Sequence, residues 1–110
     1  MSKYGNIRVH IGDEVFDSRK EADRYIELLW LLKANQITDL RRQVSFELIP
    51  AIRENGRTVQ RATHYIADFV YQQDGQTVVE DVKSPATKTP LYQMKKKLMR
   101  WQYGIDIQEV

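Results

Sequence analysis

Two acidic residues and a lysine lie close together in the segment TVVEDVKS, residues 77–84. The apolar residues around them predict a β-strand, in which alternate side chains share a face. Asp81 and Lys83 therefore point to one side of the strand, and Glu80 points to the other. At about 3.3 Å per residue, the Cα atoms of Asp81 and Lys83 lie about 6.6 Å apart. Side chains at that spacing can contact one small group between them.

A further carboxylate, Asp68, lies within the apolar segment THYIADFVY, residues 63–71. Burying it is costly unless something compensates its charge. A hairpin that turns at Asp74-Gly75 would place Asp68 opposite Asp81. A cross-strand Asp–Lys ion pair is the simplest interpretation of one isolated acid and base. It leaves the second acid unexplained, because facing like charges are destabilising unless a cation lies between them.

Glu21 is a third candidate, near the start of an expected helix. The spacing Ser18-x-x-Glu21 matches a capping box, in which the glutamate reaches back to the backbone N–H of Ser18. Taken alone, that cap is the favoured role for Glu21. The alternative is that the helix packs on the sheet and brings Glu21 over its charged face.

Three carboxylates and a lysine suit a hard divalent cation. Mg²⁺ prefers oxygen ligands and is typically held by one or two carboxylates together with substrate phosphate oxygens. Such a site fits the hydrolysis of a phosphodiester. The metal lowers the pKa of a bound water, and a lysine ammonium orients the nucleophile or stabilises the transition state.

Hydrophobic periodicity and turn signals place these residues in an α/β fold of the α+β type. We expect these elements: a hairpin around Gly12-Asp13, a helix over 17–35, strands over 43–52, 63–72 and 77–83, a helix from Pro90 and a final strand over 105–110. After the N-terminal hairpin the order is αβββαβ. It predicts a mixed β-sheet flanked by two helices.

The bulk properties narrow the class of protein. A chain of 110 residues suits one domain, 1–110, with the hairpin at 1–16 and the core at 17–110. The absence of cysteine excludes disulfides and thiolate metal sites and suits a reducing cytoplasm. No segment has the length or apolarity of a signal peptide or a membrane span, so we expect a cytoplasmic protein with no membrane partner.

Basic residues are concentrated after the strand that carries Asp81, although the formal net charge is only +2. From residue 83 to residue 100 there is no acid, and the bases are Lys83, Lys88, Lys95, Lys96, Lys97 and Arg100. Such a block favours a polyanionic partner, whereas a solvated helix face is the commoner explanation of any single charge run.

The second helix carries an apolar stripe of Leu91, Met94, Leu98 and Trp101, which we expect to face the core. Lys96 and Arg100 then lie on the opposite, exposed side. Lys95 lies near the edge of the stripe, and Lys88 is the best placed for a phosphate contact. We expect Trp30 and Trp101 to be core or dimer-surface aromatics.

These residues together resemble the PD-(D/E)XK nuclease superfamily. The matching residues are Glu21 on the first helix, Asp68 on one strand and Asp81-Val82-Lys83 on the next, within an αβββαβ order. The segments FDSRKEADRY, ATHYIADFVY, VVEDVKS and TKTPLYQMKKKLM are similar to a small phage- and prophage-associated branch of that superfamily. Two positions depart from the pattern: Ala67 stands where a proline is frequent, and Asp81 where a glutamate is commoner.

The resemblance implies a restriction-endonuclease-like core and a metal-dependent DNA endonuclease that uses Mg²⁺ or Mn²⁺ and no organic cofactor. It makes Asp68, Asp81 and the carbonyl of Val82 metal ligands, Glu21 a ligand direct or through water, and Lys83 the catalytic lysine. By analogy with Holliday-junction resolvases, it implies a branched or recombination intermediate as substrate and allows a homodimer. Lys88, Lys95, Lys96 and Arg100 would contact DNA without base specificity.

Two other classes of protein remain open. One is a non-catalytic DNA-binding phage accessory protein that retains the nuclease fold. The other is a purely structural phage or host-takeover protein with no dependence on divalent metal. The clustered acids argue against a mere DNA binder, which has no use for carboxylates facing phosphate.

Overall fold

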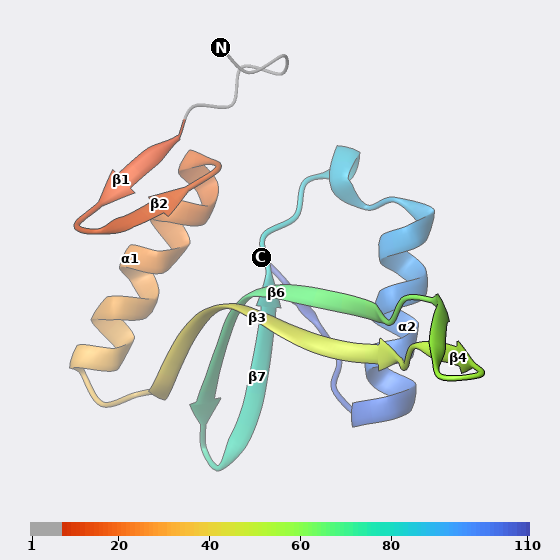
Figure 1. The fold of residues 1–110 in the computed structure, drawn as a ribbon. Coiled ribbons are helices and arrows are strands. Elements are labelled where there is room, and N and C mark those ends of the chain that lie inside the picture. Colours follow the sequence, from red (N-terminus) through yellow and green to blue (C-terminus); the bar gives the residue numbers. More distant parts are fainter. Residues whose placement is uncertain (1–7) are drawn as a thin grey trace.

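The computed structural model describes residues 8–110, so the first seven residues of the expected 1–16 hairpin segment lie outside it. Within the described part the fold is α+β, as expected (Figure 1). The elements are β1 (Val9–Ile11), β2 (Glu14–Phe16), α1 (Arg19–Lys33), β3 (Thr38–Ile49), β4 (Ile52–Glu54), β5 (Arg57–Gln60), β6 (Thr63–Gln73), β7 (Gln76–Asp81), the 3-10 turn η1 (Pro85–Thr87), α2 (Pro90–Tyr103) and β8 (Gln108–Glu109).

The main sheet has the order β3-β6-β7-β8. Its first three strands are antiparallel, and β8 runs parallel to β7. The expected turn is confirmed: Gln73 pairs with Gln76 across Asp74 and Gly75, which both adopt positive φ. That backbone is the one favoured in a two-residue hairpin. The mixed sheet and the order αβββαβ are therefore confirmed, with one hairpin inserted.

Both helices begin at a side-chain cap, and α2 ends at a glycine. The side chain of Ser18 caps α1 by accepting from the backbone N–H of Glu21 at 3.1 Å. Thr89 caps α2 in the same way, Pro90 occupies the first turn, and Gly104 ends the helix in the left-handed conformation at φ 67°. The described residues contain no helix long and apolar enough to cross a bilayer.

The sheet separates two clusters of buried apolar residues. On the α2 side the cluster includes Tyr65, Ala67, Val79, Tyr92 and Met99. The cluster on the α1 side, which the β1–β2 hairpin also covers, includes Phe16, Ala22, Leu28, Phe69 and Tyr71. Figure 1 shows α1 and α2 on opposite sides of the sheet.

Strands β3 and β6 exchange faces at one point, between these two clusters. Ala67 packs on the α2 side and Phe69 on the α1 side, although residues two apart in a regular strand share a face. Opposite this point β3 has Gln43, a non-glycine residue at φ 52°. Both strands curve strongly here in Figure 1. The kink is local strain held by the surrounding structure.

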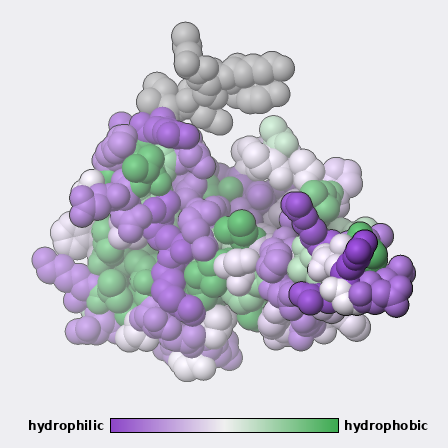
Figure 2. Space-filling view, viewed as in Figure 1, coloured by the Kyte–Doolittle hydropathy of each residue, from purple (hydrophilic) through white to green (hydrophobic). Residues whose placement is uncertain are grey.

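Two elements differ from the expectation. Strand β3 begins at Thr38, five residues before the expected start. The polar segment after Pro50, for which no strand was expected beyond residue 52, forms a further hairpin, β4–β5. All residues of β4 and β5 are exposed. The hairpin projects at the side of the molecule, where Figure 2 shows strongly hydrophilic side chains next to a small apolar patch.

The orientation of α2 also differs from the expectation. Three of the four residues of its apolar stripe lie outside the core: Leu91 and Met94 are each 63% exposed and Trp101 is 79% exposed. Only Leu98 packs against the cluster on the α2 side. Tyr92 and Met99 are buried against the sheet instead. Trp30 on α1 is exposed as well, so neither tryptophan is a core residue. A helix rotated this way presents an apolar seam outward.

Candidate functional site

Asp81 and Lys83 meet at the end of β7, as the alternation of the strand predicts. The Nζ of Lys83 lies 3.1 Å from Oδ1 of Asp81, and both side chains are largely buried. The backbone of both residues is fixed by the last residue of the chain: Val110 donates to the carbonyl of Asp81, and Lys83 donates to the carbonyl of Val110. The pair is thus held by the sheet and not by a mobile loop.

Glu80 points to the other face, as expected, and lies in a separate polar cluster. Its two carboxylate oxygens accept from Nε and Nη2 of Arg24 on α1, at 2.8 and 2.6 Å. The hydroxyl of Tyr71 donates to the same carboxylate. Glu80 is only 2% exposed, and the bidentate arginine balances its charge. The acid left without a role by the sequence is therefore a structural ion pair.

Asp68 lies beside Asp81 on the neighbouring strand. The register that pairs Phe69 with Glu80 brings residue 68 opposite residue 81, so the predicted proximity is confirmed. Oδ2 of Asp68 accepts from the backbone N–H of Val82 at 2.7 Å. Burial raises the pKa of Asp68 to about 7; the Val82 N–H opposes that rise, and the nearby charges of Asp81 and Glu21 add to it. Burial and the neighbouring acids together thus disfavour the charged form of Asp68.

Glu21 reaches this area through side chains that the sequence did not indicate. Its Oε1 accepts from Nε2 of Gln43 at 3.2 Å and from Nη2 of Arg42 at 3.4 Å, so the carboxylate faces the sheet and does not complete a capping box. Nε2 of Gln43 also lies 3.5 Å from Oδ1 of Asp68. The kink at Gln43 therefore turns one amide between the two acids. Burial raises the pKa of Glu21, and the bond from Arg42 opposes that rise.

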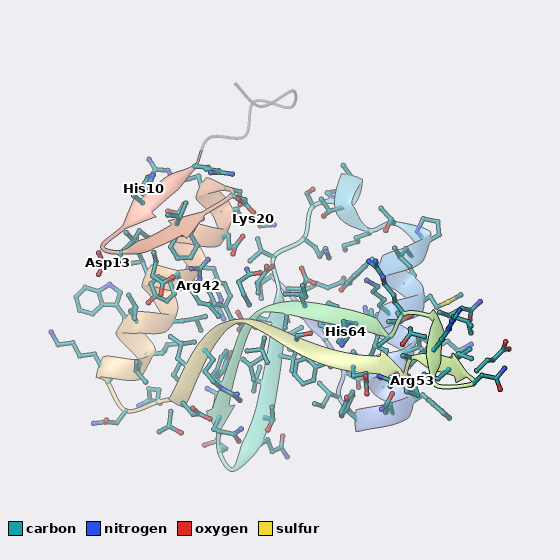
Figure 3. All side chains as sticks on the ribbon, in the orientation of Figure 1. His10, Asp13, Lys20, Arg42, Arg53 and His64 are labelled. Atoms are coloured by element: carbon teal, nitrogen blue, oxygen red, sulfur yellow. The ribbon has the colours of Figure 1, made fainter. Side chains whose placement is uncertain are left out.

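Arg42 fixes Glu21 from the β1–β2 side. Its guanidinium lies 3.8 Å from the centre of the Phe16 ring and forms an ion pair with Glu14 (Figure 3 labels Arg42 between α1 and the sheet). Nζ of Lys20 donates to the carbonyl of Lys83 at 2.6 Å, which ties the first turn of α1 to the end of the site strand. The N-terminal part of α1 is therefore anchored over the site.

Two tyrosines complete the surroundings of Asp81 and Lys83. The hydroxyl of Tyr65 on β6 donates to Oδ2 of Asp81 at 2.7 Å. Nζ of Lys83 lies 4.1 Å from the centre of the Tyr92 ring on α2, a cation–π distance. Burial raises the pKa of both phenols above the usual range, and their carboxylate partners add to this. The sequence carried no signal for either tyrosine beyond their positions in apolar patterns.

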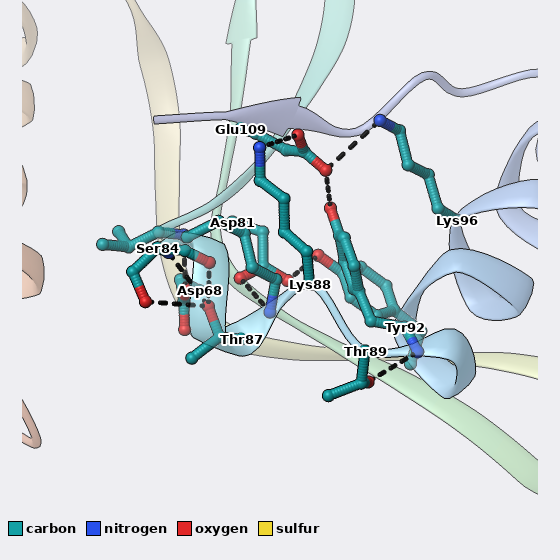
Figure 4. A network of polar contacts seen from close by, with 12 residues as sticks. Asp68, Asp81, Ser84, Thr87, Lys88, Thr89, Tyr92, Lys96 and Glu109 are labelled. Carbon is teal, nitrogen blue, oxygen red and sulfur yellow. Dashed lines mark hydrogen bonds and ion pairs between the residues drawn. The ribbon is translucent and has the colours of Figure 1, made fainter. Parts of the chain in front are cut away.

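The four predicted DNA contacts are placed differently from one another. Glu109 holds Lys88 and Lys96, each with Nζ 3.2 Å from a carboxylate oxygen, and accepts from the hydroxyl of Tyr92 at 2.7 Å (Figure 4). The Tyr92 bond and both lysines lower the pKa of Glu109 to about 2. Lys95 lines the same pocket as Asp81 and Lys83, whereas Arg100 pairs with Asp106 at the exposed end of α2.

The oxygen atoms around Asp68 and Asp81 decide whether a metal ion could be coordinated there. As they stand, the described residues 8–110 contain no group of three or more His, Cys, Asp or Glu side chains that could hold one. Asp68 and Asp81 nevertheless place two carboxylates side by side, and burial and the neighbouring acids disfavour the charged form of Asp68. A pair of carboxylates with water and phosphate oxygens is a usual set for Mg²⁺. The chemistry of this pair fits a divalent cation, and the carbonyl of Val82 as a ligand stays a prediction.

Comparison with known families assigns the chain to one of them. A family described as proteins of unknown function, DUF1064, matches residues 1–109, and the chain belongs to it. Searches of curated proteins and of solved structures gave no match.

Proposed function

We propose that this protein is a metal-dependent DNA endonuclease of the PD-(D/E)XK type. The observation that carries the proposal is the convergence of Asp68 and Asp81 from adjacent strands, with Lys83 beside Asp81. Like charges side by side are destabilising without a cation. The pKa of Asp68 is raised to about 7 by burial first, and the charges of Asp81 and Glu21 add to the rise. Folded proteins tolerate such a cost where it serves a site.

Each residue has a role that follows from its position. Asp68 and Asp81 would hold Mg²⁺ or Mn²⁺, with the Val82 carbonyl and, directly or through water, Glu21. The metal, when bound, supplies a water of lowered pKa and neutralises charge on the phosphate. The ammonium of Lys83, held between Asp81 and the Tyr92 ring, would donate to the phosphate or to the attacking water.

The DNA backbone would be bound by bases around this pocket. Lys95 already lines it. Lys88 and Lys96 face Glu109, and DNA would have to compete with that carboxylate for them. A branched DNA substrate, a homodimer and a cytoplasmic location in a phage host belong to the same proposal. The outward apolar seam of α2 supports the dimer, since exposed apolar patches mark interaction surfaces.

A cleavage assay tests the proposal against the alternative of a non-catalytic DNA-binding accessory protein. Purified protein is incubated with branched, single-stranded and linear duplex DNA, with Mg²⁺, with Mn²⁺ and with EDTA. Asp81→Ala and Lys83→Ala are compared with the exposed controls Asp13→Ala and Lys33→Ala. We expect metal-dependent cutting by the wild type and both controls, and none by the two site variants.

The other outcomes are equally clear. DNA binding without cutting in either metal would establish the accessory protein. Neither binding nor cutting would favour a structural protein. Cutting by Asp81→Ala and Lys83→Ala at the wild-type rate would show that the active site lies elsewhere.

A further inference from the structure

The hairpin β4–β5 has a regular structure but no part in the core. Its strands pair in register at Arg53 with Thr58 and Glu54 with Arg57, across a turn of Asn55 and Gly56 at positive φ. Every residue of both strands is exposed, including Ile52 at 48% and Val59 at 51%. An isolated two-stranded hairpin is at best marginally stable in water. A hairpin without a buried face contributes little to folding, so its sequence points to contact with something outside the chain.

The charge of the hairpin indicates the kind of partner. Arg53 and Arg57 lie on its strands and Arg61 follows it, against the single acid Glu54. Among residues 8–110, none of these three arginines forms an ion pair. They differ in this from Lys88 and Lys96, which Glu109 already neutralises. Unpaired guanidinium groups on a projecting ribbon complement a phosphate backbone.

The hairpin is continuous with the candidate site. Its second strand leads into β6, where His64 and Ile66 line the pocket that contains Asp81 and Lys83. Figure 3 labels His64 on the sheet and Arg53 on the projecting hairpin. At about 3.3 Å per residue, Thr63 lies about 17 Å from Asp68. The end of β3 that leads into the hairpin is held in place, because the hydroxyl of Tyr103 on α2 donates to the carbonyl of Glu47 at 2.6 Å.

From these observations we propose that β4–β5 is an arm that grips duplex DNA beside the bond to be cut. Arg53, Arg57 and Arg61 contact phosphates, and the ribbon lies in or along the major groove, which is wide enough for two strands. This proposal takes its DNA partner from the proposed function. It adds a contact surface that lies outside the basic block of residues 83–100.

Binding without cleavage tests the arm. The affinity of a fluorescent 24-base-pair duplex is measured by anisotropy in EDTA over a range of salt concentrations. Arg53→Gln/Arg57→Gln is compared with Lys33→Gln/Arg41→Gln, which removes the same charge from two exposed residues outside the hairpin, at the end of α1 and on β3. We expect the arm variant to bind on the order of tenfold more weakly near 0.1 M salt, with a salt slope smaller by about 2. The control should change little.

Three results would overturn the arm: wild-type affinity in the arm variant, an equal loss in the control, or no duplex binding by the wild type. Light scattering on both variants detects a contact between copies. If the arm variant dissociates a dimer and keeps its DNA affinity, the hairpin is a protein interface. Thermal unfolding checks that both variants are folded. Because EDTA removes divalent metal from the binding assay, its result does not depend on whether the protein cuts DNA. A failure of the arm proposal and a failure of the proposed function can therefore be told apart.

Discussion

Glu80 and Asp81 are neighbours on one strand and receive the same kinds of partner. Each accepts a hydrogen bond from a tyrosine of β6, Tyr71 for Glu80 and Tyr65 for Asp81. Each also pairs with one base, a bidentate Arg24 or the single ammonium of Lys83. The difference is Asp68, a second acid that lies only on the Asp81 side. On the Glu80 face of β7, the charge of the one acid is therefore balanced by Arg24, and the pair is structural. On the Asp81 face, two acids lie beside a single lysine, an arrangement that suits a bound cation.

The largest expected effect is on cleavage by Asp81 variants. Asp81→Asn keeps the shape of the side chain and removes its charge, so we expect cleavage to fall on the order of 10³-fold or more. The melting temperature should change little. Single-turnover rates with Mg²⁺ measure the first quantity and calorimetry the second. A variant that cuts at the wild-type rate would remove Asp81 from the site.

The opposite pattern is expected for Glu80. Glu80→Ala leaves Arg24 half-buried and without its main partner, and breaking a buried pair costs about 3–5 kcal/mol of the free energy of unfolding. Urea denaturation measures this loss. The rate per folded molecule should stay close to that of the wild type. Wild-type stability in Glu80→Ala would show that the two faces of β7 do not differ as described.

Protonation of Asp68 should make metal binding at the Asp81 face of β7 depend on pH. Below its pKa of about 7 the proton competes with a metal ion, so Mg²⁺ affinity should rise about tenfold per pH unit from pH 5.5 to 7 and level off above it. Titration calorimetry at several pH values measures this. In Asp68→Asn the affinity should be low and independent of pH. A flat profile in the wild type would contradict the role of Asp68.

The same carboxyl affects the fold without metal, and the sign is fixed by the shift. The pKa of Asp68 is raised from 3.8 to about 7, so the folded protein binds the proton more tightly than the unfolded chain. Its contribution to stability is complete below about pH 4 and is lost as the pH rises through 7. Asp68→Asn should lack this part of the pH dependence in urea unfolding. An unchanged pH dependence would mean that another group is responsible.

The smallest effects come from the two tyrosines. Removing the hydroxyl in Tyr65→Phe should slow cleavage several-fold, about 1 kcal/mol, because Asp81 loses one hydrogen bond that orients it. Tyr71→Phe is the matched change on the Glu80 face of β7. It should lower stability by a similar amount and leave the rate per folded molecule unchanged. Equal effects of both variants on the rate would erase the distinction between the faces.

Short-range rules predicted the part of the site that lies on β7. Alternation along the strand placed Asp81 with Lys83 and Glu80 opposite, and the Asp74-Gly75 turn set the register of Asp68. Those relations depend on neighbouring residues and on one turn, so they can be deduced without the rest of the fold.

Long-range relations were missed for physical reasons. The role of Gln43 depends on a kink that no turn signal marks, because glutamine seldom adopts positive φ. The apolar stripe of α2 predicted that the helix has an apolar side, but not which side the sheet would bury. Tyr92 and Glu109 come together only through the packing of α2 on β8.

The kink at Gln43 also separates the buried core into two parts that can differ in stability. The two apolar clusters lie on either side of it, and the candidate site takes Glu21 and Arg42 from one half and Tyr65 and Tyr92 from the other. Such halves can open as separate cooperative units in hydrogen exchange. A ligand that needs residues from both would bind only when both are closed, and would slow the exchange of amides in the two halves together. A ligand bound by residues of both halves would therefore couple the opening of the two clusters.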